Sequence, residues 1–411
     1  MVYMNAENNL SSYASNDLQE MVNGSVNLAS DCNLLVYYDA MSNPVIYEIK
    51  SGSKTALKTY STDIDSSDKD NMLSVFQTMI SLRPADEYAT IFWGHGDGPI
   101  IANATTNSLA SEFADVNAYG ADYNPKKYSG VTWIDIPVLA SVMKQLPKQK
   151  FIFFDACCMQ NIEVAYELRS CTDYLIGATC ETPSFGAPYA TTTPILGWSN
   201  VESAAKAIVD DYRGPNNPWA TWRQNYSINS VCMSVIKTAD IEELLTTTKT
   251  ALASLYDGIH PLQLTTTFSA DAHNATSCIY YYKTDGKHAG YSILYDFNDV
   301  MRINLSSNGY ELWKAALDRV VIYHPTPEDI RSTNMCDWFG GEHKDSSDRY
   351  ICCMSTENFK SFYLSDDTFG GVSFFFPMST YTYHTSPNMN KRMYDYEWCQ
   401  KVGWEQMGWP Q

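Results

Sequence analysis

The chain has 411 residues, of which 45% are hydrophobic and 13% aromatic, so it is a globular protein rather than a disordered one. Its formal net charge of −19 argues against binding to nucleic acid, because such binding requires basic side chains that neutralise phosphates. Its sequence contains no apolar run of about 18 residues, so we expect no transmembrane segment.

The first part of the chain alternates between strand and helix patterns. Residues 34–39 and 44–49 are predicted strands joined by a short polar turn. Apolar side chains at helical spacing predict a helix over residues 68–84, which ends at its proline. A β-rich run over residues 88–98 stops abruptly at glycines. Residues 97–130 show little periodicity, which is typical of a long loop or insertion.

The same alternation continues through the middle of the chain. A helix, a buried strand, a second helix and a second buried strand are predicted over residues 135–147, 151–154, 161–170 and 174–178. This order indicates an α/β fold with a mainly parallel sheet and helices on both faces. Because the pattern changes near residue 235, we predict a first domain over 1–235 and a C-terminal lobe over 236–411 that packs on it.

Two of the predicted parallel strands end in residues that are capable of nucleophilic chemistry. The stretch "WGHG" ends the first strand with His95, and "DACC" ends the second with Cys157. In an open parallel sheet, ligands bind beyond the carboxyl ends of the strands, and neighbouring strands lie about 4.8 Å apart. If the two strands are neighbours, the loops that carry His95 and Cys157 meet at one edge of the sheet.

The residues around this pair favour a cysteine–histidine site. The start of the helix near Asn161 and a nearby imidazolium both favour a thiolate at Cys157. Gly96 lets the backbone approach a substrate closely, and its N–H is placed to donate to an oxyanion. A purely structural interpretation stays open, because cysteine is among the most buried residue types and a histidine at a strand end is commonly structural.

The combination of "WGHG" and "FFDAC" resembles the signature of the clostripain-like cysteine peptidases, which are related to caspases, gingipains and legumains. Other segments resemble the family's opening strand and helix, the helix, strand and loop after the nucleophile, and the closing segment. They are residues 2–21, 162–168, 174–178, 185–189, 371–377 and 396–404. The resemblance therefore spans nearly the whole chain, and it implies a caspase-like fold.

The resemblance also implies a mechanism, in which a thiolate attacks a peptide carbonyl and forms an acyl-enzyme that water hydrolyses. His95 would be the catalytic base and acid, and Cys157 the nucleophile. The amides of Gly96 and Cys157 would form the oxyanion hole. Relatives prefer Arg or Lys before the scissile bond, which requires an acidic S1 pocket. Asp155 and Glu181 are the candidates for that pocket.

The S1 candidates and a possible cleavage site each have a plainer interpretation. Asp155 can also serve to satisfy backbone donors at the end of its strand, and Glu181 can be an ordinary exposed glutamate. Some family members cut themselves between the two catalytic blocks. Lys126 and Lys127 lie in that interval, in an expected exposed loop.

The cysteines raise two further points. Their number, eleven, is odd, so at least one thiol has no disulfide partner within the chain. Cys158 and Gln160 depart from the family, which usually has an apolar residue and a glycine there. We expect Cys158 to point into the core, because alternate positions face opposite ways. A disulfide between Cys157 and Cys158 would silence the nucleophile.

No metal site and no organic cofactor are expected. The adjacent cysteine pairs lack the C-x-x-C spacing of zinc ligands. Some relatives depend on calcium, but the sequence contains no D-x-D-x-D-G loop. The expected partner is a peptide or protein substrate, and a monomer is favoured.

No signal peptide is visible, so a secreted, cell-surface or periplasmic location in a bacterium is implied by the family alone. Two other functions stay open. A catalytically inactive family member would bind peptides or another ligand through the same crevice. A serine hydrolase is disfavoured, because the chain has no G-x-S-x-G elbow.

Overall fold

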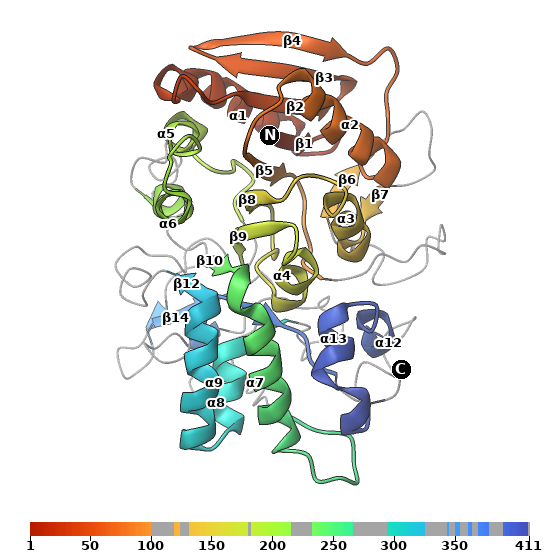
Figure 1. Cartoon of the computed structure of the whole chain (residues 1–411), viewed down its shortest axis with the longest axis vertical. Coiled ribbons are helices and arrows are strands. Elements are labelled where there is room, and N and C mark those ends of the chain that lie inside the picture. The colour runs from red at the N-terminus through yellow and green to blue at the C-terminus, as the bar shows by residue number, and fades with distance from the viewer. Residues whose placement is uncertain are drawn as a thin grey trace.

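A nine-stranded sheet forms the centre of the computed structural model, in the order β12-β10-β9-β8-β5-β1-β2-β3-β4 (Figure 1). In chain order its strands are β1 (Val2–Asn5), β2 (Leu34–Ala40), β3 (Ser42–Lys50), β4 (Ser53–Thr59), β5 (Tyr88–Trp93), β8 (Gln149–Asp155), β9 (Thr172–Ala178), β10 (Met233–Lys237) and β12 (Val321–Tyr323). The structure describes residues 1–99, 119–123, 131–179, 182–214, 232–265, 294–324, 369–377 and 389–409, and the backbone of three short strands, β13 (His343–Lys344), β14 (Tyr350–Cys353) and β15 (Ser361–Tyr363).

The five central strands, β2, β1, β5, β8 and β9, run parallel to one another. The strands at both edges of the sheet pair in the antiparallel sense. Parallel strands are buried on both faces, which is why their sequences are continuous apolar runs such as "FIFF" in β8. This arrangement confirms the predicted α/β fold with a mainly parallel sheet.

Helices cover both faces of this sheet. On one face lie α1 (Ser11–Gly24), α5 (Tyr189–Ile195) and α6 (Val201–Arg213), whose apolar residues share one core cluster with the sheet. On the other face lie α2 (Lys69–Leu82), α3 (Ile136–Met143) and α4 (Ile162–Leu168), which belong to a second cluster. In Figure 1, α5 and α6 are accordingly on the left of the sheet and α2 and α3 on the right.

The predicted elements of the first half are present with small differences in their ends. The helix predicted over 68–84 is α2, and it begins where the carboxylate of Asp68 accepts hydrogen bonds from two backbone amides. The helix predicted over 161–170 is the shorter α4, which Asn161 caps in the same way. Of the interval 97–130, the structure describes residues 97–99 and 119–123. There, β6 (Tyr119–Asp122) pairs with β7 (Thr132–Ile134).

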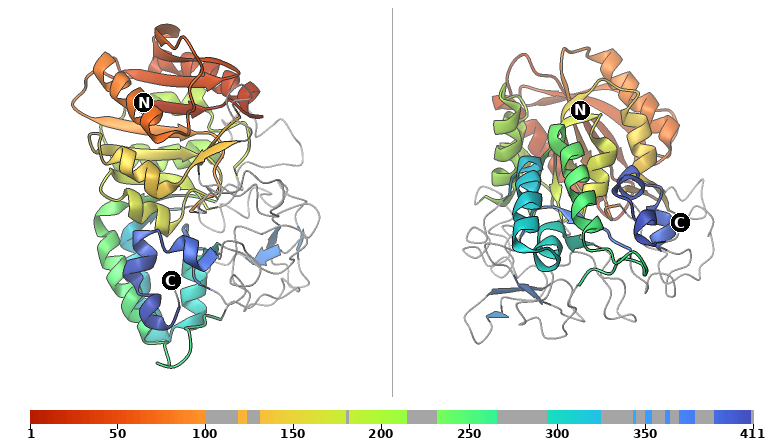
Figure 2. Two further views of the ribbon diagram at one scale, coloured as in Figure 1. Left: turned by 90° about the vertical axis from the view of Figure 1, so that its right-hand side faces the viewer. Right: turned by 60° about the horizontal axis from the view of Figure 1, so that its bottom comes forward.

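The C-terminal half packs directly on the sheet. Its helices are α7 (Ile241–Ala253), α8 (Phe297–Asn304), α9 (Ser307–Val320), α12 (Met389–Met393) and α13 (Glu397–Val402), and two short strands, β11 (Tyr295–Asp296) and β16 (Ser373–Phe374), pair beside them (Figure 2). The ring of Trp398 lies 5.6 Å from that of Tyr166 in α4. Strand β10 extends across residue 235 within the main sheet. The division into domains over 1–235 and 236–411 stays a prediction.

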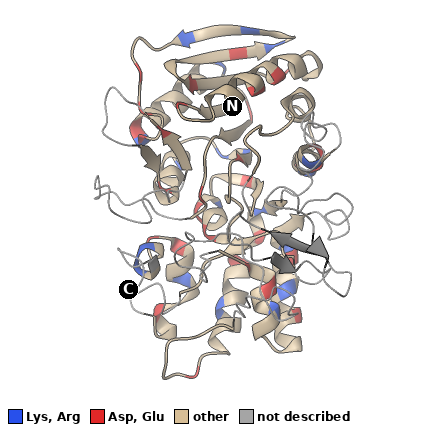
Figure 3. Ribbon diagram, turned by 180° about the vertical axis from the view of Figure 1, so that it is seen from behind, with Lys and Arg blue, Asp and Glu red and all other residues tan. Residues whose placement is uncertain are grey.

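Charged side chains are spread over both halves of the described chain, as Figure 3 shows. Among the helices that the structure describes, none combines the length and the apolar character needed to cross a bilayer.

Candidate active site

The two strands that carry the predicted nucleophile and base are neighbours. β5 and β8 pair in parallel, with Trp93 opposite Asp155 at the carboxyl end of each strand. The N–H of Gly94 also donates to the carbonyl of Asp155 at 3.3 Å, so the pairing continues one step further. His95 and Cys157 each follow two residues after this matched pair. The two loops therefore leave the same edge of the sheet at the same level.

Gly96 is where the two loops come into contact. A Cβ atom built on Gly96 would lie 2.8 Å from the carbonyl oxygen of Cys157 and 3.0 Å from Sδ of Met159. No residue with a side chain fits there without displacing the Cys157 backbone. The loop is held from its other side by β6, because the N–H of Gly120 donates to the carbonyl of His95 at 2.9 Å.

The ring of His95 is half-buried and is held by a side chain that the sequence analysis missed. Nε2 of His95 lies 2.6 Å from Oδ1 of Asn9. An amide oxygen only accepts hydrogen bonds, so Nε2 carries the proton and Nδ1 is the nitrogen able to take another. The ring of Trp133 lies 6.2 Å away. Burial lowers the pKa of His95, so the imidazole is a neutral base near pH 7.

The sulfur of Cys157 is half-buried and receives a hydrogen bond from a backbone amide. The N–H of Thr182, in the loop after β9, lies 3.3 Å from Sγ. The hydroxyl of Thr182 lies 3.6 Å from the same sulfur. The N–H groups of Glu163 and Val164 at the start of α4 are taken by the side chain of Asn161. Sγ also lies 3.7 Å from the carbonyl oxygen of Thr182, so the backbone of Thr182 offers the sulfur both a donor and an acceptor.

The second cysteine of the adjacent pair has a different role. Cys158 is completely buried, as predicted, and neither it nor Cys157 is in a disulfide. Its φ angle is +59°, a left-handed conformation that is uncommon for any residue but glycine. Strained backbone of this kind is concentrated at functional turns. The turn at Cys158 reverses the chain directly after Cys157 and leaves the two side chains in different surroundings.

Asp155 lies beneath this site with its carboxylate buried. Oδ2 accepts hydrogen bonds from the N–H of Ala187 at 2.9 Å and the hydroxyl of Tyr189 at 2.8 Å. The carboxylate therefore anchors the loop over residues 185–189. Burial, opposed by these hydrogen bonds, raises the pKa of Asp155 to about 6. These contacts fit the plainer interpretation of Asp155, in which its carboxylate accepts hydrogen bonds from donors near the end of the strand.

A second buried acid accompanies Asp155. The carboxylate of Asp17 accepts a hydrogen bond from Nε1 of Trp93 at 2.7 Å. Burial, together with the charge of Asp155, raises the pKa of Asp17 well above its usual range. Gly186, with a φ angle of +59°, fits between the two acids, because a Cβ there would lie 2.6 Å from Oδ2 of Asp17 and 2.8 Å from Oδ2 of Asp155.

The remaining predicted residues, Glu181, Lys126 and Lys127, lie outside the described residues. The neighbours that were missed, Asn9 and Thr182, follow β1 and β9 at the same edge of the sheet. Ligands bind beyond the carboxyl ends of parallel strands, and this principle applies to the loops after β1 and β9 as well as to those after β5 and β8. Together, the site provides a thiol, a neutral imidazole and backbone N–H donors, which are the parts of a nucleophilic acyl-transfer site.

Comparisons with known proteins show the family and the fold of this chain. The model of the clostripain family matches residues 2–405. A secreted C11 cysteine protease from Bacteroides thetaiotaomicron, solved in complex with an irreversible peptide inhibitor, is 26% identical and has a TM-score of 0.69 over 98% of each chain. An inactive zymogen C11 protease from Parabacteroides distasonis is 23% identical, with a TM-score of 0.68 over 98% of this chain and 96% of the other. No curated protein sequence matches the chain.

We predict that Gly96→Ala separates the two loops. The added methyl group would overlap the Cys157 carbonyl and push the loop that carries His95 away. Alkylation of Cys157 by iodoacetamide, followed by mass spectrometry, is expected to slow by about tenfold or more. Gly309→Ala is the control, because there the nearest atom is the flexible Ser306 hydroxyl at 3.2 Å. Equal rates in the two variants would show that the loops do not depend on this contact.

Proposed function

This chain belongs to the clostripain family and is a cysteine-type peptidase, and we propose that Cys157 is its nucleophile and His95 its general base and acid. The observation that carries the proposal is the contact of the two loops at Gly96, beyond the matched ends of β5 and β8. It keeps a neutral imidazole and a thiol at one edge of the sheet.

The proposed reaction begins with the transfer of the Cys157 proton to Nδ1 of His95. The thiolate, stabilised by the amide of Thr182, attacks the carbonyl carbon of the scissile peptide bond. The N–H groups of Gly96 and Cys157 donate to the oxyanion that forms. His95 then protonates the leaving amine as the C–N bond breaks and an acyl-enzyme remains. Water, deprotonated by His95, hydrolyses the thioester and restores the thiol.

We further propose that cleavage follows Arg or Lys. The family resemblance makes Asp155 a candidate for the floor of the S1 pocket, and its buried carboxylate holds the loop over residues 185–189 through the N–H of Ala187. A basic side chain in an adjacent S1 pocket would be attracted by the charge of Asp155, which is ionised above about pH 6, because buried charges are weakly screened. Glu181 is proposed to add a second carboxylate.

The proposed setting is outside the bacterial cytoplasm, as a secreted, cell-surface or periplasmic enzyme that acts on peptides or proteins. Two similar solved structures are of C11 proteases described as secreted, and one of them holds a peptide inhibitor. A monomer is the proposed state. The alternative is a family member that binds peptides without cleaving them. The following labelling experiment distinguishes it from an active peptidase.

Iodoacetamide is expected to label Cys157 faster than any other cysteine, because a thiolate reacts and a thiol does not. His95→Ala should remove this advantage, with a loss of about tenfold or more in rate, and should abolish peptide hydrolysis. Cys171→Ala is a matched control, since Cys171 is buried and directly precedes β9, at the end of the sheet opposite to the site. Slow labelling of Cys157 that does not change in His95→Ala would favour the alternative, a protein that binds peptides without cleaving them.

Fluorogenic peptides with Arg or Lys before the bond are expected to be cleaved at least about a hundredfold faster than those with Ala or Asp. Because the pKa of Asp155 is raised to about 6, its carboxyl gains a proton as the pH falls through that value. The preference for Arg over Ala should therefore decrease below about pH 6. Rapid cleavage after Ala or Asp, with none after Arg or Lys, would remove basic specificity from the proposal.

We also propose that the enzyme cuts itself after Lys126 or Lys127. The wild-type protein is expected to split into two fragments on storage, as seen on a denaturing gel and by mass spectrometry. Cys157→Ala should stay intact, and a double Lys126→Gln, Lys127→Gln variant should stay intact while it still hydrolyses peptides. Equal integrity of wild type and Cys157→Ala would contradict self-cleavage.

A further inference from the structure

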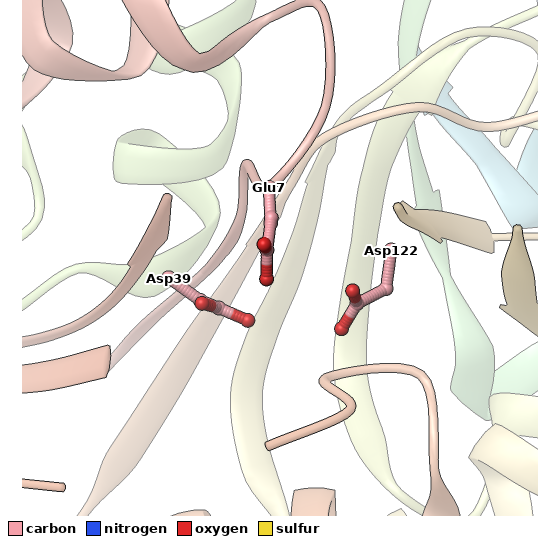
Figure 4. Close-up of side chains that lie close together, drawn as sticks. All are labelled: Glu7, Asp39 and Asp122. Atoms are coloured by element: carbon pink, nitrogen blue, oxygen red, sulfur yellow. The ribbon is translucent and has the colours of Figure 1, made fainter. Parts of the chain in front are cut away.

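Three buried carboxylates meet at the same edge of the sheet, beside β1 and β2 (Figure 4). Glu7 follows β1, Asp39 lies near the end of β2, and Asp122 ends β6. One oxygen from each carboxylate lies within 4.8 Å of the other two. Figure 4 shows the three side chains pointing toward a common centre.

Within the part of the chain that the structure describes, one buried oxygen of Asp39 and one of Asn5 have no hydrogen-bond donor. Asp39 is completely buried, and its Oδ1 has no hydrogen-bond partner, although its Oδ2 accepts from the hydroxyl of Ser66. Asn5, which is opposite Asp39 in the register of β1 and β2, is equally buried, and its Oδ1 also has no partner. Buried polar atoms in native proteins are almost always satisfied, so two unpaired oxygens beside a cluster of carboxylates are suited to bind a cation.

The charged groups around Asp39 favour a positively charged ligand. The charged groups that act most strongly on it are Asp122, Glu7 and Asp63, and all three are acidic. Several carboxylates buried together are strongly unfavourable unless a cation or protons compensate them.

The donor atoms and their spacing favour calcium. Carboxylate and amide oxygens are ligands of hard cations rather than of zinc or copper. Calcium binds oxygen at about 2.3–2.6 Å, so two oxygens on opposite sides of the ion lie up to about 5 Å apart. Magnesium gives up its waters reluctantly and is seldom held by protein ligands alone, whereas calcium takes several carboxylate and carbonyl oxygens. We propose that Glu7, Asp39 and Asp122 bind one calcium ion, with Asn5 as a further oxygen ligand.

Such an ion would connect β6 to the ends of β1 and β2. The backbone already links these segments, since the N–H of Tyr123 donates to the carbonyl of Glu7 at 3.0 Å. The N–H of Ser66 donates to Oδ2 of Asp122 at 2.6 Å, which orients that carboxylate. Calcium would neutralise the repulsion that otherwise drives Asp122, and β6 with it, away from Asp39.

The position of β6 matters because it supports the loop that carries His95. Gly120 donates to the carbonyl of His95, and Tyr119 forms a β-bridge with Gly96. The three carboxylates thus act as positioning residues that hold the loop against Cys157. The effect on peptide hydrolysis rests on the proposed function, whereas binding of the ion does not.

The test uses full-length Cys157→Ala protein, which stays intact, after treatment with EDTA and removal of the chelator. Isothermal titration with calcium is expected to show one ion per chain, and excess calcium should raise the melting temperature by several degrees. Adding Asp39→Asn or Asp122→Asn should weaken binding at least about tenfold and remove the thermal shift. Adding Asp86→Asn, which removes an exposed carboxylate, should change neither result.

Folding of the variants is checked in the same experiment. Because Asp39→Asn relieves repulsion, we expect its melting temperature without calcium to equal or exceed that of the parent. If this variant does not fold, Glu7→Gln replaces it. Absence of calcium binding in the parent, or unchanged binding in all the folded variants, would overturn the proposal.

Activity separates this inference from the proposed function. Removal of calcium from the wild type is expected to slow peptide hydrolysis, and added calcium should restore it. If Cys157→Ala binds calcium but the wild type hydrolyses no peptide, the ion site stands and the proposed function fails. If the wild type hydrolyses peptides and Cys157→Ala binds no calcium, the site fails and the proposed function stands.

Discussion

The parallel register of β5 and β8 is the constraint on which the rest of the site depends. By pairing Trp93 with Asp155, it starts two loops at the same level. His95 and Cys157 then lie two residues beyond this pair, each in the loop that follows its strand. A shift of one residue between these strands would turn alternate side chains to the other face and separate the two groups. The glycine at position 96 completes the arrangement, because it alone lets one loop rest on the carbonyl of the other.

Buried acidic groups surround this edge, and each ties a loop to the sheet. Asp155 binds the amide of Ala187 and the hydroxyl of Tyr189, and so holds the segment that follows β9. Asp122 accepts a hydrogen bond from the amide of Ser66, in the segment between β4 and α2. Buried carboxylates cost free energy, and a hydrophobic substitute is often as stable. Here these carboxylates give the loops a defined position and are not a source of stability.

The adjacent cysteines show how one turn gives chemically equal residues different surroundings. Cys157 lies two residues beyond the end of β8 and keeps its sulfur beside the amide of Thr182. Cys158 adopts a left-handed conformation and is completely buried. The turn between them leaves one cysteine partly exposed and the other completely buried. The fold of solved C11 proteases matches this chain over nearly its whole length, although only about a quarter of the residues are identical.

Local sequence determined the strands, the helices and the two loops that carry His95 and Cys157, because apolar periodicity and glycines at strand ends act over a few residues. It did not determine the partners of those groups. Asn9 meets His95, and Thr182 meets Cys157, from segments far away in the chain. The three acids beside β1 form no contiguous calcium motif, so only the folded sheet brings them together. Contacts between remote segments depend on strand order and register, which local periodicity does not encode, and the tertiary structure alone decides them.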